Sequence, residues 1–101
     1  MQFAEDRYYM QTQKTPVYLK ASTLRDISDI PALKEDIKKH MILIIRVTPL
    51  AQKDPEELRK VVEDLYSYAQ STGGDIARLG EERIVITPSG VKIWRGMYDL
   101  K

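Results

Sequence analysis

The sequence lacks cysteine altogether and holds one histidine and one tryptophan among its 101 residues. Without cysteine the chain forms no disulfide, no thiolate zinc site and no cysteine nucleophile. Sixteen lysines and arginines against fifteen aspartates and glutamates give a net charge of +1, so the basic excess typical of nucleic-acid binders is missing. The longest apolar run, residues 41–45, is far shorter than the roughly 20 residues of a transmembrane helix.

Residues that could carry chemistry are also scarce. His40 is the sole histidine and follows two lysines at the predicted end of a helix, where positive charge suits the helix dipole. Asp54, Glu56 and Glu57 cluster at a predicted helix start, where capping explains carboxylates better than cation binding does. We therefore expect no catalytic residue, no metal and no cofactor, and hence a protein that is not an enzyme.

One domain accounts for the length, because about 100 residues bury one hydrophobic core and not two. Residues 1–16 are polar and without periodicity, and we interpret them as a flexible N-terminal arm. Residues 17–94 contain all the regular patterns and form the predicted core domain. Residues 95–101 are of mixed character and are expected to form a C-terminal tail.

The first half of the core domain predicts two strands around one helix. Residues 17–21 alternate in polarity, which is typical of a strand. Asp29 is positioned to cap a helix that has Pro31 in its first turn. Five consecutive apolar residues within 41–47 indicate a strand that is covered on both faces and therefore central. Residues 50–53 are predicted to form a loop.

The clearest helix begins at Asp54, with Pro55 in the first helical position and Glu57 placed for a capping box. Apolar residues then recur at helical spacing, which predicts one buried stripe made of Leu58, Val61, Val62, Leu65 and Ala69. Gly73 and Gly74 follow the helix and precede a strand. That position indicates a tight structural turn, since the glycines of a phosphate-binding loop precede a helix.

Three short strands are predicted after this helix, at residues 75–79, 83–87 and 91–94, with turn sequences between them. The complete order of elements is then β-α-β-α-β-β-β. Such an order is typical of a small α/β (α+β) sandwich, with a five-stranded sheet and two helices on one of its faces.

Two helices cover one face of such a sheet. The second face also carries apolar side chains, and the question is what covers them. Ile44 and Val85 lie on that second face, together with Trp94 from the last predicted strand. We expect a second copy of the chain to cover these three residues in a homodimer. The alternative is an antiparallel sheet whose second face is solvated, which is a common arrangement.

Residues 66–91 contain a distinctive pattern. It consists of GGDI, then a basic residue and a glycine, then an apolar strand that ends in TP before a turn. This pattern resembles the C-terminal part of the SepF family of cell-division proteins. The upstream segment LRDISDIPALKEDIKKHMILIIRV is similar to the archaeal branch of that family, so the resemblance covers residues 17–93.

The resemblance implies a non-enzymatic adaptor that dimerises in the cytoplasm, at the inner face of the cell membrane and at the division site. Members of the family bind the C-terminal peptide of the tubulin-like protein FtsZ and tether its filament to the membrane through an N-terminal amphipathic helix. Two departures stand out in this sequence. Residues 1–16 lack the basic amphipathic pattern of such a helix, and Ser67 stands where bacterial members carry a glycine linked to polymerisation.

For the FtsZ peptide, the resemblance and the apolar pattern together predict a shallow groove between the second helix and the fourth strand. The predicted contacts are Ile84 and Ile86 from the strand, with Val62, Tyr66 and Ala69 from the helix. The alternative is that these residues form the core under the helix, as the helical spacing of Val62 indicates. A rival function is a small α/β regulatory domain that binds a metabolite, which would need convergent polar groups in a pocket.

Overall fold

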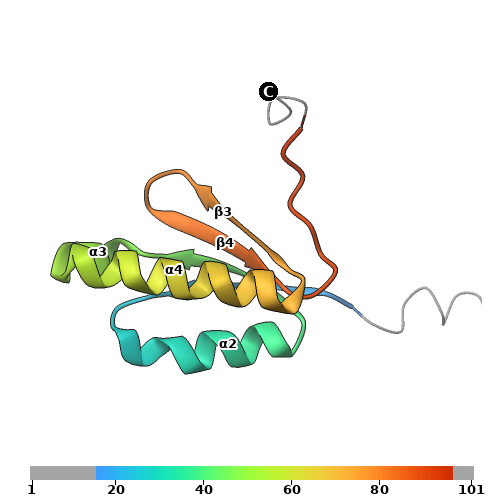
Figure 1. The fold of residues 1–101 in the computed structure, drawn as a ribbon, viewed down its shortest axis with the longest axis horizontal. Helices are drawn as coiled ribbons and strands as arrows, with labels where there is room; N and C mark the ends of the chain where they lie inside the picture. Colours follow the sequence, from blue (N-terminus) through green and yellow to red (C-terminus); the bar gives the residue numbers. More distant parts are fainter. Residues whose placement is uncertain (1–15, 97–101) are drawn as a thin grey trace, which may run out of the picture.

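Four strands and one layer of helices make up the part of the chain that the computed structural model describes, residues 16–96 (Figure 1). The elements are β1 (Tyr18–Thr23), the 3₁₀ helix η1 (Ile27–Asp29), α2 (Ile30–Lys38), β2 (Met41–Arg46), α3 (Thr48–Lys53), α4 (Pro55–Thr72), β3 (Asp75–Leu79) and β4 (Arg83–Thr87). None of these helices is both long enough and apolar enough to cross a membrane. The predicted N-terminal arm and C-terminal tail lie almost entirely outside the described residues.

The strands form a mixed sheet in the order β1-β2-β4-β3. β1 runs parallel to β2, because α2 carries the chain back along the sheet before β2 begins. β2 is antiparallel to β4, and β3 and β4 form an antiparallel hairpin. β1 and β3 are therefore the edge strands, and Lys20 of β1 is ion-paired to Asp36 of α2 with 2.9 Å between Nζ and Oδ2.

Alternation along the strands decides which residues enter the core. Leu43 and Ile45 of β2 lie opposite Ile86 and Ile84 of β4 in the register, and all four side chains are buried beneath the helices. The remaining core residues come from the helices and the segments beside them: Leu24, Ile30, Leu33, Ile37, Val47, Leu50, Val61, Leu65 and Ala69. The predicted central position of β2 and the small α+β architecture are confirmed.

The long helix α4 begins and ends at the predicted residues. Asp54 Oδ1 accepts a hydrogen bond from the backbone N–H of Glu57 at 3.1 Å, which caps the helix at its N-terminus. Gly73 ends the helix with φ at +82°, in the left-handed region that glycine adopts without a steric cost. The chain then turns directly into β3.

Two local predictions were wrong. Asp29 does not cap α2 with its side chain, because its carboxylate accepts the backbone N–H of Asp26 at 3.2 Å within a capping box that adds the 3₁₀ turn η1. Residues 50–53, predicted as a loop, belong to the short helix α3. Pro49 fits the first turn of that helix, and Leu50 stabilises it because its side chain is fully buried.

The predicted fifth strand at residues 91–94 does not form, so the sheet of the described chain has four strands and the predicted order needs correction. The backbone N–H of Ile93 donates to Asp75 Oδ2 at 2.9 Å instead of to a neighbouring strand. Arg95 binds the same carboxylate, with 2.9 Å between Nη1 and Oδ2. The carboxylate of Asp75 therefore holds this segment, and the backbone hydrogen bonds of a strand pair are not formed.

Gly74 lies directly against β4, since a Cβ atom built on it would be 2.1 Å from the carbonyl oxygen of Thr87. We expect Gly74→Ala to lower the free energy of unfolding by about 2–3 kcal/mol, because backbone must move to admit the methyl group. Gly80→Ala is the matched control: φ is +74° but no atom lies within 4 Å, so a loss of about 1 kcal/mol is expected. Urea unfolding compares the two variants, and equal losses would contradict the close contact.

The Asp75 anchor predicts a pH dependence. The Arg95 guanidinium, helped by the backbone N–H groups of Ile93 and Ile76, lowers the pKa of Asp75 from 3.8 to about 2, although burial acts in the opposite direction. Because the pKa is lower in the folded state, the ionised Asp75 stabilises the fold. This contribution is fully present above about pH 4 and is lost as the pH falls toward 2. We expect Asp75→Asn to lower the free energy of unfolding by about 1–2 kcal/mol at pH 7.

The same substitution should flatten the stability profile between pH 4 and pH 2, which urea unfolding at a series of pH values measures. A variant that follows the wild-type profile over that interval would contradict the role of this carboxylate.

Candidate functional site

The sheet face opposite the helices, here called the open face, is apolar at its centre. Ile44 of β2 lies directly opposite Val85 of β4, and the small residues Ala21 and Ala77 flank this pair on the edge strands. Ile44 and Val85 are only half-buried. The apolar residues of the open face are Leu19, Ala21, Ile42, Ile44, Ala77, Leu79 and Val85. Two of the three residues predicted for a dimer contact are thus neighbours on this face.

Trp94, the third of those residues, lies outside the sheet with 87% of its surface exposed. Its neighbours Ile93 and Arg95 both bind the carboxylate of Asp75, and Asp75 occupies an open-face position at the start of β3. The backbone on both sides of the tryptophan is therefore fixed, and the indole ring is presented to solvent beside the open face.

A groove of about 310 Å³ lies between α4 and β3 on the helix layer, and we call it the α4–β3 groove. One side of α4 supplies an apolar lining, and charged side chains stand around it. The lining residues are Pro55, Leu58, Arg59, Val62, Glu63 and Arg78. An apolar floor with a charged rim is suited to a short peptide.

The two arginines of the α4–β3 groove differ in their partners. Arg59 is neutralised within α4 by Glu56 and Glu63, and its hydrogen bond lowers the pKa of the Glu56 carboxyl. The Arg78 guanidinium donates to two backbone carbonyls after β3, at 3.4 and 3.5 Å. Among residues 16–96 no carboxylate lies within ion-pair distance of Arg78, so its guanidinium is available to an acidic partner.

Two of the five residues predicted to contact a peptide reach the surface beside this groove. Val62 lines it, and Tyr66, one helical turn further along α4, is 54% exposed. Ile84, Ile86 and Ala69 are 4%, 0% and 0% exposed, because β4 and α4 direct them into the core. These three side chains are buried in the core, so they are not available to a peptide on the surface, and the predicted contacts need correction at these positions.

Leu58 and Arg78 are groove residues that the sequence analysis did not assign to the site. Leu58 precedes Val62 by one helical turn on the same side of α4. Arg78 lies on the helix-layer face of β3, in the same alternation as Ile76. Both signals are present in the sequence, but only the placement of β3 beside α4 brings the two residues together.

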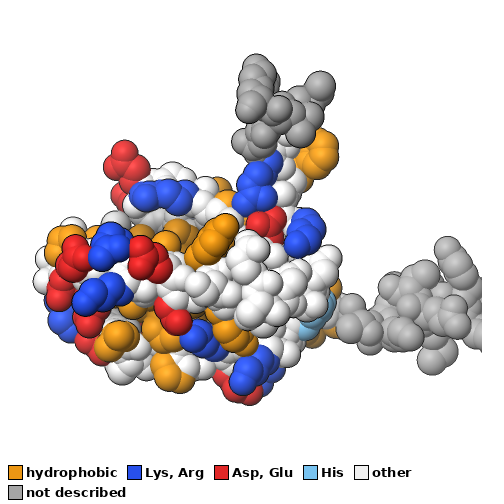
Figure 2. Space-filling view, viewed as in Figure 1, with side chains coloured by type: hydrophobic (Ala, Val, Ile, Leu, Met, Phe, Trp, Pro, Cys, Tyr) orange, Lys and Arg blue, Asp and Glu red, His pale blue; other side chains and the backbone are white. Residues whose placement is uncertain are grey.

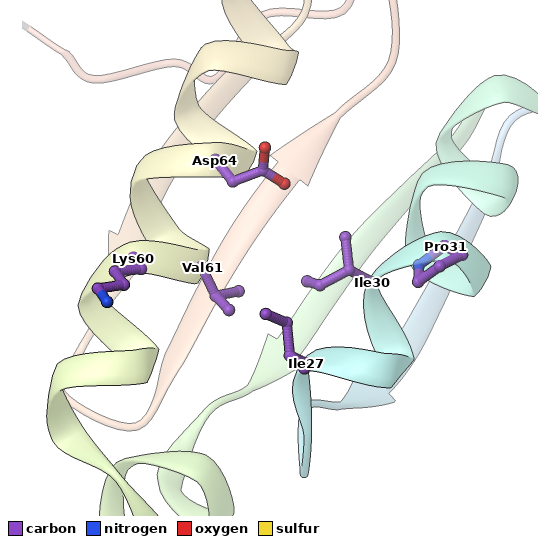
Figure 3. Close-up of a pocket in the computed structure, with 6 residues that line it drawn as sticks. All are labelled: Ile27, Ile30, Pro31, Lys60, Val61 and Asp64. Atoms are coloured by element: carbon purple, nitrogen blue, oxygen red, sulfur yellow. The ribbon is translucent and has the colours of Figure 1, made fainter.

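A second groove, the α2–α4 groove, has a volume of about 320 Å³. Ile27, Ile30 and Val61 point toward one another between the two helices (Figure 3). Asp64 stands at its border and is ion-paired to Lys34 with 2.9 Å between Oδ2 and Nζ. Figure 2 shows the same helix layer from outside, with acidic and basic side chains interspersed and hydrophobic side chains exposed between them.

The residues that the sequence analysis weighed for chemistry, His40 and the pair Gly73 and Gly74, lie where the chain turns. Within residues 16–96 no three histidine, aspartate or glutamate side chains gather as metal ligands would. His40 is exposed and follows α2 with φ at +69°. Gly73 ends α4 and Gly74 packs against β4, so this pair forms a turn. The candidate sites of the described chain are the two grooves and the open face.

Comparison with known proteins assigns the chain to a family. The family model described as cell division protein SepF matches residues 20–93. The cell division protein SepF of Haloferax volcanii is 31% identical over 67 residues, which cover 66% of this chain and 56% of that protein. The chain thus spans just over half the length of this curated relative.

Solved structures of similar fold come from archaea. The SepF-like protein from Archaeoglobus fulgidus superposes with a TM-score of 0.73 at 28% identity, covering 78% of this chain and 94% of that one. The SepF-like protein from Pyrococcus furiosus gives 0.72 at 29% identity, covering 79% and 96%. SepF from Methanobrevibacter smithii, solved in complex with FtsZ-CTD, shares the fold with a TM-score of 0.68 at 18% identity, covering 77% and 98%. The chain belongs to the SepF family of cell division proteins, in its archaeal form.

Proposed function

We propose that this chain is a non-enzymatic adaptor of cell division that binds the C-terminal peptide of FtsZ in the α4–β3 groove. The observation that carries the proposal is the apolar lining of that groove beside an arginine, Arg78, that has no carboxylate partner among the described residues. The FtsZ-CTD complex of the Methanobrevibacter smithii protein supports the choice of partner.

The α4–β3 groove has the physical character that a short peptide needs. Leu58, Val62 and Tyr66 follow one another at intervals of four along α4, so they form an apolar strip that an apolar peptide side chain can cover. Tyr66 adds a flat ring with a hydroxyl at the rim. Arg78 faces this strip from β3 and can bind a carboxylate of the peptide through two N–H groups.

The proposed active form is a homodimer joined through the open face. Burying Ile44, Val85 and Trp94 against a second copy would remove apolar surface that the single chain leaves in contact with water. The grooves lie on the helix layer, on the other side of the sheet, so a dimer keeps both of them accessible. Two equal sites give avidity for a filament that displays many identical peptides, even where a single site is weak.

Within the cell, the proposed place of action is the cytoplasmic face of the membrane at the division site, where the adaptor helps to tether the FtsZ filament. Membership of the SepF family supports this location. The membrane contact is indirect or made by a segment outside the described residues.

The rival function, a regulatory domain that binds a metabolite, has less support. A metabolite site needs several polar groups that converge on the ligand. The α2–α4 groove is lined by the apolar residues Ile27, Ile30, Pro31 and Val61, and of its two charged residues, Lys60 and Asp64, the second is already ion-paired to Lys34. The α4–β3 groove has polar groups only around its rim, where they suit the ends of a peptide.

Val62→Glu tests the peptide site. The substitution places a charge in the apolar lining of the α4–β3 groove, so we expect at least a ~10-fold loss of affinity for the FtsZ C-terminal peptide by isothermal titration. Arg78→Glu should weaken binding in the same direction, because it reverses the charge that the groove presents.

Ile27→Glu is the matched control, since it adds the same charge to the other groove of the helix layer at a side chain that is 51% exposed. This variant should bind the peptide as the wild type does. Folded Val62→Glu and Arg78→Glu proteins with unchanged affinity would place the peptide elsewhere, and no binding by the wild type would contradict the proposed function itself.

Trp94 provides a direct measurement of the proposed homodimer, because it is the only tryptophan of the chain. In the single copy the ring is largely exposed. As the protein concentration rises from micromolar to millimolar, we expect the emission to shift to shorter wavelength and acrylamide quenching to fall. The shift should follow the dimer fraction from sedimentation equilibrium, and a dimer whose tryptophan remains fully quenchable would remove Trp94 from the interface.

A further inference from the structure

The last described residues are fixed to the same strand that borders the α4–β3 groove. Arg95 Nη1 donates to Asp75 Oδ2 at 2.9 Å, and Arg95 Nη2 donates to the backbone carbonyl of Ile76 at 2.9 Å. Arg95 therefore binds the first two residues of β3. Arg78, which lines the groove, follows Ile76 by two residues, or about 7 Å along the strand. The chain that continues after Arg95 thus starts close to the groove.

Residues 97–101, here called the tail segment, lie outside the described residues. Gly96, which precedes them, has φ at +71°, a conformation typical of a turn. Five residues span up to about 17 Å when extended, which is more than the distance along β3 from Ile76 to Arg78. Since β3 is an edge strand, the tail segment can pass around it to the helix layer while Trp94 stays beside the open face.

The tail segment and the α4–β3 groove are chemically complementary. Met97, Tyr98 and Leu100 bring apolar or aromatic groups, and Asp99 brings the one carboxylate side chain among them. The groove offers the apolar strip of α4 and the guanidinium of Arg78. A segment that runs from its anchor in the direction of β3 places Asp99 next to Arg78 and Leu100 next to the strip. Such a pairing of a carboxylate with an arginine is geometrically specific.

The described carboxylates near the groove do not provide this partner. Glu63 at the groove is bound by Arg59, and Asp75 is bound by Arg95. Glu81 meets Arg78 through its backbone carbonyl at 3.4 Å, and its side chain makes no ion pair within residues 16–96. Asp99 is the next acidic residue along the chain, and it follows directly from the segment that β3 holds.

We propose that the tail segment occupies the α4–β3 groove of its own chain, with Asp99 bound to Arg78, and that it competes there with the FtsZ peptide. A short tether gives the segment an effective concentration on the order of millimolar, so a weak contact suffices to populate the closed form. An incoming peptide then binds only the open fraction, which lowers its apparent affinity. The competition rests on the proposed function, whereas the contact between tail segment and groove does not.

Cysteine cross-linking tests the contact in the full chain, which has no cysteine of its own. In the variant Val62→Cys, Leu100→Cys we expect an intramolecular disulfide to form about fivefold faster than in Lys60→Cys, Leu100→Cys, as measured by intact mass under mild oxidation. Val62 lines the α4–β3 groove and Lys60 lines the α2–α4 groove. The two positions are about 3 Å apart along the helix axis, so the length of the tether is matched.

A charge exchange identifies the ion pair by the same readout. Arg78→Glu should slow the closure of the Val62→Cys, Leu100→Cys disulfide, because it places a carboxylate opposite Asp99. Adding Asp99→Arg to that chain should restore the rate, since the two charges are again opposite. A rate that stays low in the exchanged variant would overturn the pairing of Asp99 with Arg78.

Asp99→Asn tests the competition. Loss of the carboxylate opens the groove, so the FtsZ C-terminal peptide should bind about threefold or more tightly in isothermal titration. Glu81→Gln is the control, because it removes the same charge from an exposed residue beside the groove and leaves the tail segment unchanged. Its affinity for the peptide should stay within about 1.5-fold of the wild type in physiological salt.

The outcomes separate the inference from the proposed function. Equal rates of disulfide formation at Val62 and Lys60 overturn the contact of the tail segment, and the peptide site stands if the wild type binds the peptide. A selective cross-link together with an unchanged affinity of Asp99→Asn overturns the competition. A selective cross-link in a chain that does not bind the peptide supports the tail contact and contradicts the proposed function.

Discussion

The packing of α2 and α4 against one face of β2 and β4 is the interaction on which the remaining structure depends. Leu43 and Ile45 on one strand, with Ile84 and Ile86 on the next, are covered by Val61, Leu65 and Ala69 of α4. Within residues 16–96 the helices form one layer, so no helix of this part of the chain covers the other apolar side chains of β2. Both kinds of candidate site follow from that asymmetry: the grooves of the helix layer and the open face on the other side of the sheet.

The fold could be predicted from the sequence wherever local patterns and tertiary packing agree. Asp54, Gly73 and the run at residues 41–45 mark the start of α4, its end and a central strand, and the structure follows all three. The prediction of a fifth strand failed because the alternating pattern of residues 91–94 is typical of a strand, whereas a side-chain acceptor binds a backbone N–H group of this segment. Asp75 takes the N–H that a strand partner would have bound, and no pattern within residues 91–94 reveals that competition.

The candidate groove was predicted in part, for a related reason. Helical spacing identifies the apolar side of α4, but it does not show which residues of that side are buried and which are exposed. Val62 is half-buried and Tyr66 is exposed, whereas Ala69 and the isoleucines of β4 are buried. Arg78 could not be assigned at all, since its role depends on β3 being an edge strand next to α4. The order of strands in a sheet is a tertiary property that spacing along the chain does not carry.

The position of the two edge strands has a consequence for how the molecule can assemble without forming fibrils. An uncharged, flat edge invites another strand to add to the sheet, and such addition repeats without end. Here β1 carries Lys20, which is ion-paired to Asp36, and β3 carries Arg78, so a charged side chain on each edge strand opposes the addition of a further strand. Growth in the plane of the sheet is thereby opposed, whereas the proposed stacking of two open faces would use up that surface in a single step.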